Sequence, residues 1–193
     1  MEEAGKICLI GAYAVGKSAL VRRCLGASPP ASYRCTLGLS ISRASIPVQG
    51  RAQVFSLWDF QGSGSFGRVN VLCLREADAL IFVADGTRME TLRIALDMRD
   101  QVLGLTGDLP NALLLNKADL KKLWEIPENS LDELAGQGIK AVKSSAATGL
   151  GVTEVFANLA AETLAKTPPP HSRSYAPKTR SLSRAALQRE EQS

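Results

Sequence analysis

The sequence contains few of the residues that build histidine-based, disulfide-linked or metal-binding sites. Its 193 residues include a single histidine, His171, and four cysteines, which are Cys8, Cys24, Cys35 and Cys73. The cysteines are widely spaced and form no Cys-x-x-Cys pair, so we expect reduced thiols rather than a disulfide frame or a cysteine metal site. Because His171 lies in a segment rich in Pro and Ser, the sequence argues against catalysis by histidine.

Long apolar runs and a strong excess of one charge are also missing. Without an apolar run or a basic segment after its first residues, Met-Glu-Glu, the sequence predicts neither a secretory signal nor a membrane span. The net charge is +4, and residues 167–193 carry most of it, with five Lys and Arg residues against two Glu residues. The rest of the chain is nearly neutral, so we expect no nucleic-acid partner.

Short apolar segments recur along most of the chain, of which 45% is hydrophobic. Apolar runs predict strands over 6–11, 79–85, 111–117 and 139–146. The last three are nearly continuous in hydrophobicity, as expected for strands buried on both faces. Two alternating stretches, 39–48 and 52–59, flank Gln49-Gly50 and predict a β-hairpin.

Helical segments, such as 17–26 and 151–166, lie between these strands. This order predicts an α/β fold with a mostly parallel six-stranded sheet, one antiparallel strand and helices on both faces. From Thr167 onward the chain is rich in Pro, Ser and Arg, so burial cannot offset its ordering entropy. We therefore expect one domain over 1–166 and a disordered basic tail over 167–193.

The segment GAYAVGKS, Gly11 to Ser18, matches the phosphate-loop pattern G-x-x-x-x-G-K-[ST] between a predicted strand and a predicted helix. In such a loop, backbone N–H groups close around phosphates, the lysine reaches the β- and γ-phosphates, and the serine binds Mg²⁺. The predicted phosphate-binding residues are Gly11, Tyr13, Ala14, Val15, Gly16, Lys17, Ser18 and Ala19.

A second motif, NKAD, closes the predicted strand 111–116 with Asn116, Lys117 and Asp119. The Asp119 carboxylate can accept two hydrogen bonds from the N1–H and N2–H₂ edge of guanine, which adenine lacks, while the Lys117 stem lies against the base. A further polar turn, SSA at 144–146, follows the next predicted strand. Together these motifs favour a guanine nucleotide, and they disfavour an adenine-nucleotide enzyme because Asp119 would face the N1 acceptor of adenine.

At this point the chain resembles the Ras superfamily of small GTPases, and its Rab-like branch most closely, over residues 6 to about 165. The segment TLG at 36–38 is similar to the first switch of that family, and WDFQG at 58–62 is similar to the second. The resemblance implies a P-loop NTPase G domain that binds GTP or GDP with Mg²⁺.

The resemblance also implies roles for individual residues. Thr36 would bring its hydroxyl to Mg²⁺ and its N–H to the γ-phosphate, and Asp59 would hold Mg²⁺ through a water, which makes the metal set Ser18, Thr36 and Asp59. The Gly62 N–H would sense the γ-phosphate, and Tyr33 would close over the nucleotide. Ser145 and Ala146 would offer backbone N–H groups to the guanine carbonyl oxygen.

The catalytic loop departs from the family pattern. The residue after Gly62, where the family has a glutamine that orients the attacking water, is Ser63, and Gln61 lies on the other side of the glycine. The candidate catalytic residues are therefore Gln61, Gly62 and Ser63, and we expect slow hydrolysis.

Two further departures concern the nucleotide. Tyr13 occupies a phosphate-loop position that is often small in the family, so its ring either blocks the path of an activator's arginine or points outward without interfering. Pro29-Pro30 replaces the aromatic residue that usually packs on guanine, which predicts looser binding.

The sequence as written has no lipidation site, because it ends Glu190-Glu191-Gln192-Ser193 and has Glu2 where myristoylation needs glycine. We expect a cytoplasmic monomer whose contact with membranes is at most weak, through the basic tail. The leading interpretation is a guanine-nucleotide switch and weak GTPase that recruits an effector protein, with activating and exchange proteins as further partners. The alternative is a GTP-locked binding module or scaffold without useful hydrolysis.

Overall fold

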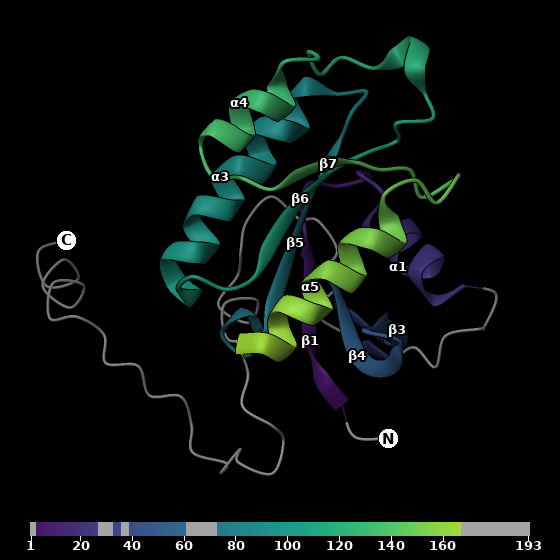
Figure 1. The fold of residues 1–193 in the computed structure, drawn as a ribbon. Helices are drawn as coiled ribbons and strands as arrows, with labels where there is room; N and C mark the ends of the chain where they lie inside the picture. The colour runs from purple at the N-terminus through teal and green to yellow at the C-terminus, as the bar shows by residue number, and fades with distance from the viewer. Residues whose placement is uncertain (1–2, 27–32, 36–38, 61–72, 167–193) are drawn as a thin grey trace, which may run out of the picture.

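The computed structural model describes residues 3–26, 33–35, 39–60 and 73–166 of the chain (Figure 1). The predicted tail, 167–193, lies outside these residues, as do parts of both expected switch segments. The strands are β1 (Glu3–Ile10), β2 (Tyr33–Cys35), β3 (Leu39–Val48), β4 (Arg51–Phe60), β5 (Ala79–Asp85), β6 (Asn111–Asn116) and β7 (Ala141–Lys143). The helices are α1 (Lys17–Leu25), α3 (Met89–Thr106), α4 (Ser130–Gly136) and α5 (Val152–Lys166), with a 3₁₀ turn, η1 (Lys121–Leu123).

The described strands form one sheet in the order β2-β3-β4-β1-β5-β6-β7. Parallel pairing joins β1 to β4 and β5, β5 to β6, and β6 to β7. The strand β3 pairs antiparallel with both β2 and β4, so it alone runs against the other described strands. The α/β class and the mostly parallel sheet with one antiparallel strand are confirmed.

The sheet has one strand more than the six that the sequence predicts. The additional strand, β2, is three residues long and pairs with the first three residues of β3. A segment this short presents no apolar period of its own, so its pairing depends on the neighbouring strand rather than on its sequence pattern.

The predicted hairpin between β3 and β4 is present. Its strands are joined through Gln49 and Gly50, with φ angles of 50° and 75°, and the pair Val48 and Arg51 closes the turn. Positive φ at both central residues is the conformation whose twist matches that of a tight β-hairpin. The hairpin carries the chain to Asp59, near the end of β4.

Two apolar layers cover the faces of the sheet. Alternate residues of the central strands point to opposite faces, and β5 is buried along its whole length. One layer packs under α1 and α5, and the other packs under α3 and α4 (Figure 1). The edge strand β7 differs from the expectation for 139–146, because only three residues pair and all three are half-buried.

The parallel strands place their carboxyl ends along one edge of the sheet, where β1, β5 and β6 end at Ile10, Asp85 and Asn116. No helix among the described residues is long and apolar enough to cross a membrane.

The loop after β5 packs tightly against η1 through Gly86 and Trp124. A Cβ atom added to the buried Gly86 would lie 1.9–2.4 Å from three atoms of the Trp124 ring, whereas one added to Gly104 of α3 would meet no atom within 4 Å. The carbonyl of Gly86 also accepts the Glu125 N–H at 2.8 Å. Only glycine allows this approach of backbone to indole.

We predict that Gly86→Ala lowers the free energy of unfolding by at least about 1–3 kcal/mol, because the indole has to move or the loop has to shift. Urea unfolding followed by circular dichroism measures this change. The matched control is Gly104→Ala, in helix α3. Alanine has a higher helix propensity than glycine, so this substitution should raise the free energy of unfolding by about 0.5–1 kcal/mol. Equal effects of the two substitutions would contradict the packing described.

Candidate nucleotide-binding site

The predicted phosphate loop connects β1 to α1 over residues 11–16. The strand β1 is fixed between β4 and β5, and the first residue of α1 is Lys17. Gly16 is left-handed, with φ of 99°, and a Cβ atom there would lie 2.3 Å from the side-chain nitrogen of Asn116. The turn into α1 therefore requires glycine for its conformation and for the close approach of Asn116.

Lys17 places a buried ammonium group across this loop. Its side chain is 6% exposed, and Nζ donates to the carbonyls of Gly11 at 2.9 Å and Ala12 at 2.8 Å. Burial lowers the pKa of Lys17, and the charge of Asp59 opposes this shift. Because both acceptors are neutral carbonyls, an anion beside Nζ would stabilise the buried charge further.

The first turn of α1 provides the donors for such an anion. No side chain caps this helix at Gly16, and no acidic residue lies in its first turn. The first N–H groups of a helix have no partner within the helix, and the helix dipole favours negative charge there. Lys17 and the start of α1 therefore form an arrangement whose charge and donors fit a phosphate.

Ser18 and Asp59 form the candidate metal position. The Ser18 hydroxyl, on α1, donates to Oδ2 of Asp59, on β4. Asp59 is 4% exposed, and its Oδ1 atom is buried without a hydrogen-bond partner among the described residues. A hydroxyl and a carboxylate with an unpartnered oxygen fit Mg²⁺, which prefers oxygen ligands and keeps several waters.

Asn116 fastens the phosphate loop to the loops that carry the other predicted residues. Its Nδ2 donates to the Val15 carbonyl at 2.9 Å, and its Oδ1 accepts the Ala146 N–H at 3.1 Å. The side chain is 1% exposed, so these bonds are shielded from water. The predicted residue Asn116 thus contacts the phosphate loop and the 144–146 turn at once.

Asp119 is held by a residue of that same turn. Its Oδ1 accepts the Ser145 hydroxyl at 2.5 Å. The Ser145 N–H, in contrast, donates to the Leu150 carbonyl at 3.0 Å. Ser145 therefore positions Asp119 through its side chain, and the expectation that the Ser145 and Ala146 N–H groups meet a guanine carbonyl stays a prediction.

A pocket of about 760 Å³ opens beside these residues. Its lining residues are Gly16, Ala19, Arg22, Arg23, Gly26, Asn116, Lys117, Asp119, Leu120, Ala146 and Ala147. The predicted residue Ala146 is in the wall, and so is Ala147, which was not predicted because the end of a three-residue edge strand does not fix the register of the turn that follows.

Two arginines of α1 also line the pocket and were not predicted. Arg23 donates from Nη2 to the Thr148 carbonyl at 2.5 Å, which ties α1 to the loop before α5. Arg22 and Arg23 follow Ala19, another residue of the pocket wall, by three and four positions, and this helical spacing was the available signal.

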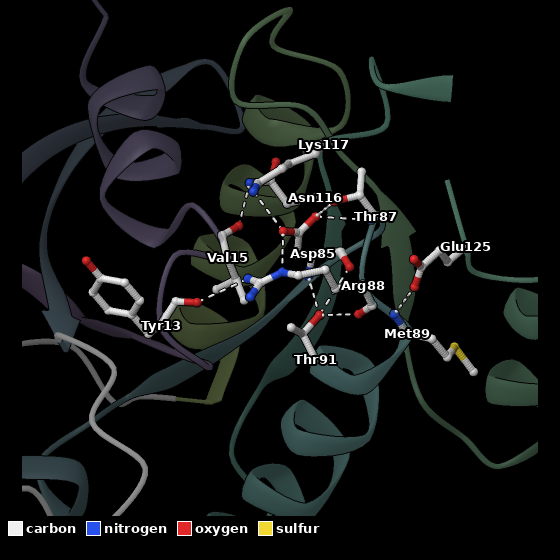
Figure 2. A network of polar contacts seen from close by, with 10 residues as sticks. All are labelled: Tyr13, Val15, Asp85, Thr87, Arg88, Met89, Thr91, Asn116, Lys117 and Glu125. Carbon is white, nitrogen blue, oxygen red and sulfur yellow. Dashed lines mark hydrogen bonds and ion pairs between the residues drawn. The ribbon is translucent and has the colours of Figure 1, made fainter. Parts of the chain in front are cut away.

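A second, unpredicted polar network surrounds Asp85, at the carboxyl end of β5 (Figure 2). Asp85 is 1% exposed, and its Oδ2 accepts from Lys117 Nζ at 2.7 Å and from Arg88 Nε at 2.9 Å. Its Oδ1 accepts from the N–H and the hydroxyl of Thr87. Burial by itself would raise the pKa of Asp85, but the hydrogen bonds from Lys117, Thr87 and Arg88 outweigh it and lower this pKa to about 2.

The Asp85 network reaches the phosphate loop at Tyr13. Arg88 Nη2 donates to the Tyr13 carbonyl at 3.1 Å. The Tyr13 side chain is 78% exposed, and Figure 2 shows its ring pointing away from Asp85 and Arg88. The ring therefore lies on the solvent side of the loop, where an approaching protein would meet it.

Several predicted site residues lie outside the described part of the chain. These are Thr36, Gln61, Gly62 and Ser63. Tyr33 is placed through its backbone alone, as the first residue of β2. The assignments of the catalytic loop, of Thr36 to the metal and of Tyr33 to the nucleotide thus stay predictions.

Comparison with known proteins gives consistent matches. The sequence model of the Ras family matches residues 6–165. Ras-related protein Rab-13 of Bos taurus is 27% identical over 163 residues, covering 83% of this chain and 80% of that protein. Ras-related protein Rab-4 of Dictyostelium discoideum is 29% identical over 153 residues, covering 78% and 75%. GTP-binding protein YPTM1 of Zea mays is 28% identical over 158 residues, covering 81% and 76%.

We predict that Asp85→Asn lowers the free energy of unfolding at pH 7 by about 2–3 kcal/mol, because the lowered pKa of Asp85 reports the stabilisation of its charged form. This stabilisation is complete above the unfolded-state pKa and is lost as the pH falls toward the folded-state pKa of about 2. The difference between the two proteins should therefore shrink from pH 4 downward in urea titrations.

The control is Asp100→Asn, which removes a carboxylate that is 77% exposed and pairs with Arg99 at 3.2 Å. Exposed pairs contribute about 0–1 kcal/mol, so this variant should behave almost like the unmodified protein. A difference between the Asp85 variant and the unmodified protein that stays constant from pH 7 to pH 3 would contradict the charge argument.

Proposed function

Since this chain belongs to the Ras family and is a Rab-like, GTP-binding small GTPase, we propose that it is a guanine-nucleotide switch with slow intrinsic hydrolysis. In this proposal, GTP and Mg²⁺ order the loops around Thr36 and Gly62, and an effector protein recognises the ordered state. GDP leaves these loops without their γ-phosphate contacts.

The observation that carries the proposal is that one buried residue, Asn116, joins the region suited to phosphates to the pocket that contains Asp119. Lys17 and the start of α1 favour phosphates, and Asp119 lies in the wall of the adjoining pocket. Asn116 bonds to the phosphate loop at Val15 and to the pocket at Ala146. One nucleotide spanning both regions would satisfy the buried cation and the carboxylate together.

Asp119 supports guanine over adenine. Its Oδ1 already accepts from Ser145 Oγ, which orients the carboxylate, and each carboxylate oxygen has a second acceptor site. Charge-assisted hydrogen bonds to two guanine donors would add to affinity, whereas the N1 acceptor of adenine would repel the carboxylate.

Mg²⁺ fits the arrangement of Ser18 and Asp59, with Thr36 as the third proposed residue. When bound, the ion would neutralise phosphate charge. Ser18 would supply its hydroxyl, and Asp59 would accept from a metal-bound water through the oxygen that has no hydrogen-bond partner among the described residues.

Slow turnover follows from the residues that replace the usual catalytic glutamine. Ser63 is too short to orient a water as glutamine does, and Gln61 starts two residues early. The exposed ring of Tyr13 adds an obstacle on the side from which an activating protein would deliver an arginine. The same features favour the second candidate, a GTP-locked binding module, if turnover is absent altogether.

We propose cytoplasmic action with partners of three general kinds: effectors, activating proteins and exchange proteins. An effector would read the segments next to β2, β3 and β4, since the proposed switch residues adjoin these strands in the sequence. An activating protein would have to accommodate Tyr13.

We predict that the unmodified protein binds GDP far more tightly than ADP, and that Asp119→Ala removes most of this preference. Each charge-assisted bond contributes about 1.5–3 kcal/mol, so losing two should weaken GDP binding by at least about 100-fold. Calorimetric titration of both nucleotides measures the change.

The control is Asp108→Ala, because Asp108 carries an exposed carboxylate, with 94% of its side chain accessible, and lies outside the pocket wall. This variant should bind GDP like the unmodified protein. Equal affinity of the unmodified protein for GDP and ADP would refute the guanine assignment.

We predict that single-turnover hydrolysis of bound GTP proceeds at or below about 10⁻⁴ s⁻¹, the scale of unassisted small GTPases. Ser63→Gln should speed this step, because a glutamine at this position can orient the attacking water. Tyr13→Gly should leave the rate of unassisted hydrolysis nearly unchanged. It should instead increase the acceleration of hydrolysis by an activating protein that supplies an arginine.

Two results separate the outcomes. If the unmodified protein hydrolyses GTP quickly and Gln61→Ala abolishes this activity, the early glutamine positions the water and the slow-switch proposal is wrong. If hydrolysis stays undetectable even in the Ser63→Gln variant, the GTP-locked module is the better description.

A further inference from the structure

We propose that Arg88 is a positioning residue for nucleotide retention: by binding the Tyr13 carbonyl, it holds Ala14 in a left-handed conformation and keeps the phosphate loop shaped for phosphates. This inference rests on the proposed function and adds a residue that lies outside the phosphate-loop, NKAD and switch motifs. It concerns how long the nucleotide stays bound.

Ala14 has an unfavourable backbone conformation at the centre of the loop. Its φ is 61°, in the left-handed region that residues with a Cβ atom rarely adopt. Such a conformation persists where the surrounding contacts over-determine it. The energy that holds Ala14 in place must therefore come from bonds to its neighbours.

The carbonyls on both sides of Ala14 are held by side chains from other elements. The Val15 carbonyl accepts from Asn116 at 2.9 Å, and the Tyr13 carbonyl accepts from Arg88 at 3.1 Å. The two donors flank the strained residue in sequence (Figure 2). Removing Arg88 would free the peptide between Tyr13 and Ala14 to rotate toward a relaxed conformation, whereas the Asn116 bond holds the next peptide along, between Val15 and Gly16.

Arg88 is itself fixed strongly enough to act as a clamp. Its Nε donates to the buried Asp85 carboxylate at 2.9 Å, and its own N–H donates to the Asp85 carbonyl at 3.0 Å. The Arg88 carbonyl accepts from the N–H and the hydroxyl of Thr91. Although the side chain is 46% exposed, its backbone and its Nε atom are anchored on one rigid loop.

The clamp also connects the two halves of the nucleotide site. Asp85 Oδ2 accepts from Lys117 as well as from Arg88, so a continuous chain of bonds runs from the pocket wall to the phosphate loop. The guanidinium group spans the distance because Nε and Nη2 point to separate acceptors. A lysine at position 88 has a single nitrogen, which cannot occupy the separate positions of Nε and Nη2.

The test is the rate at which the full chain releases fluorescent GDP when excess unlabelled GDP is added. We expect Arg88→Ala to speed release about tenfold, equivalent to about 1.4 kcal/mol. Arg88→Lys, which keeps the charge, should speed release by at least about threefold, because it cannot hold both acceptors. The matched control is Arg93→Ala, at an exposed arginine of α3, which should leave the rate unchanged.

A second substitution separates backbone positioning from the charge of the arginine. Glycine adopts the left-handed conformation readily, so adding A14G to R88A should bring the release rate back to within about threefold of the unmodified protein. Amide hydrogen exchange provides an independent readout: R88A should speed exchange over residues 12–16, whereas R93A should not.

The proposal is overturned if R88A and R88K release GDP within about twofold of the unmodified rate. It is also overturned if release is faster but A14G does not slow it in the R88A background, since Arg88 would then act through its charge. Should R88A fail to fold, R88K still decides the question. Failure of the unmodified chain to bind GDP would instead refute the proposed function, which keeps the two tests distinct.

Discussion

The buried hydrogen bond from Asn116 to the Val15 carbonyl joins the two parts of the candidate site. It connects the end of β6 to the phosphate loop, while the second polar atom of the same amide receives the Ala146 N–H. An unsatisfied group at this depth would cost about 1–3 kcal/mol, so both bonds act as constraints on the loops that they join. The position of the phosphate loop relative to the 144–146 turn therefore depends on one residue that is 1% exposed.

The sequence predicted the parts of the site that depend on local pattern. Lys17 and Ser18 follow a buried strand in a phosphate-loop spacing, and Asn116 and Asp119 follow another strand, so topology brings them to the same edge of the sheet. The parallel order and the hairpin followed from apolar periodicity in the same way. These features need only the direction of each strand and the point where it ends.

The parts that the sequence did not predict depend on contacts between distant segments. The bond from Arg88 to the Tyr13 carbonyl joins residues 75 positions apart, and nothing in the alternation of apolar residues encodes where a long guanidinium side chain will point. Ala147 in the pocket wall was missed for a related reason: β7 is short and half-buried, so the register of the turn after it is set by Asn116 and not by burial.

The positions of the tryptophans give the protein built-in optical probes of the loop after β5 and of strand β4. The Trp124 ring packs on Gly86, which lies between Asp85 and Arg88 in the sequence. Lys143 Nζ lies 5.5 Å from the centre of the Trp124 ring. Trp58 directly precedes Asp59 and donates its indole N–H to Ser56. The chain has two tryptophans, so replacing one of them with phenylalanine would leave a single emitter, either beside the loop that follows β5 or on β4. Rearrangements of these two regions could then be timed separately, without attaching a dye.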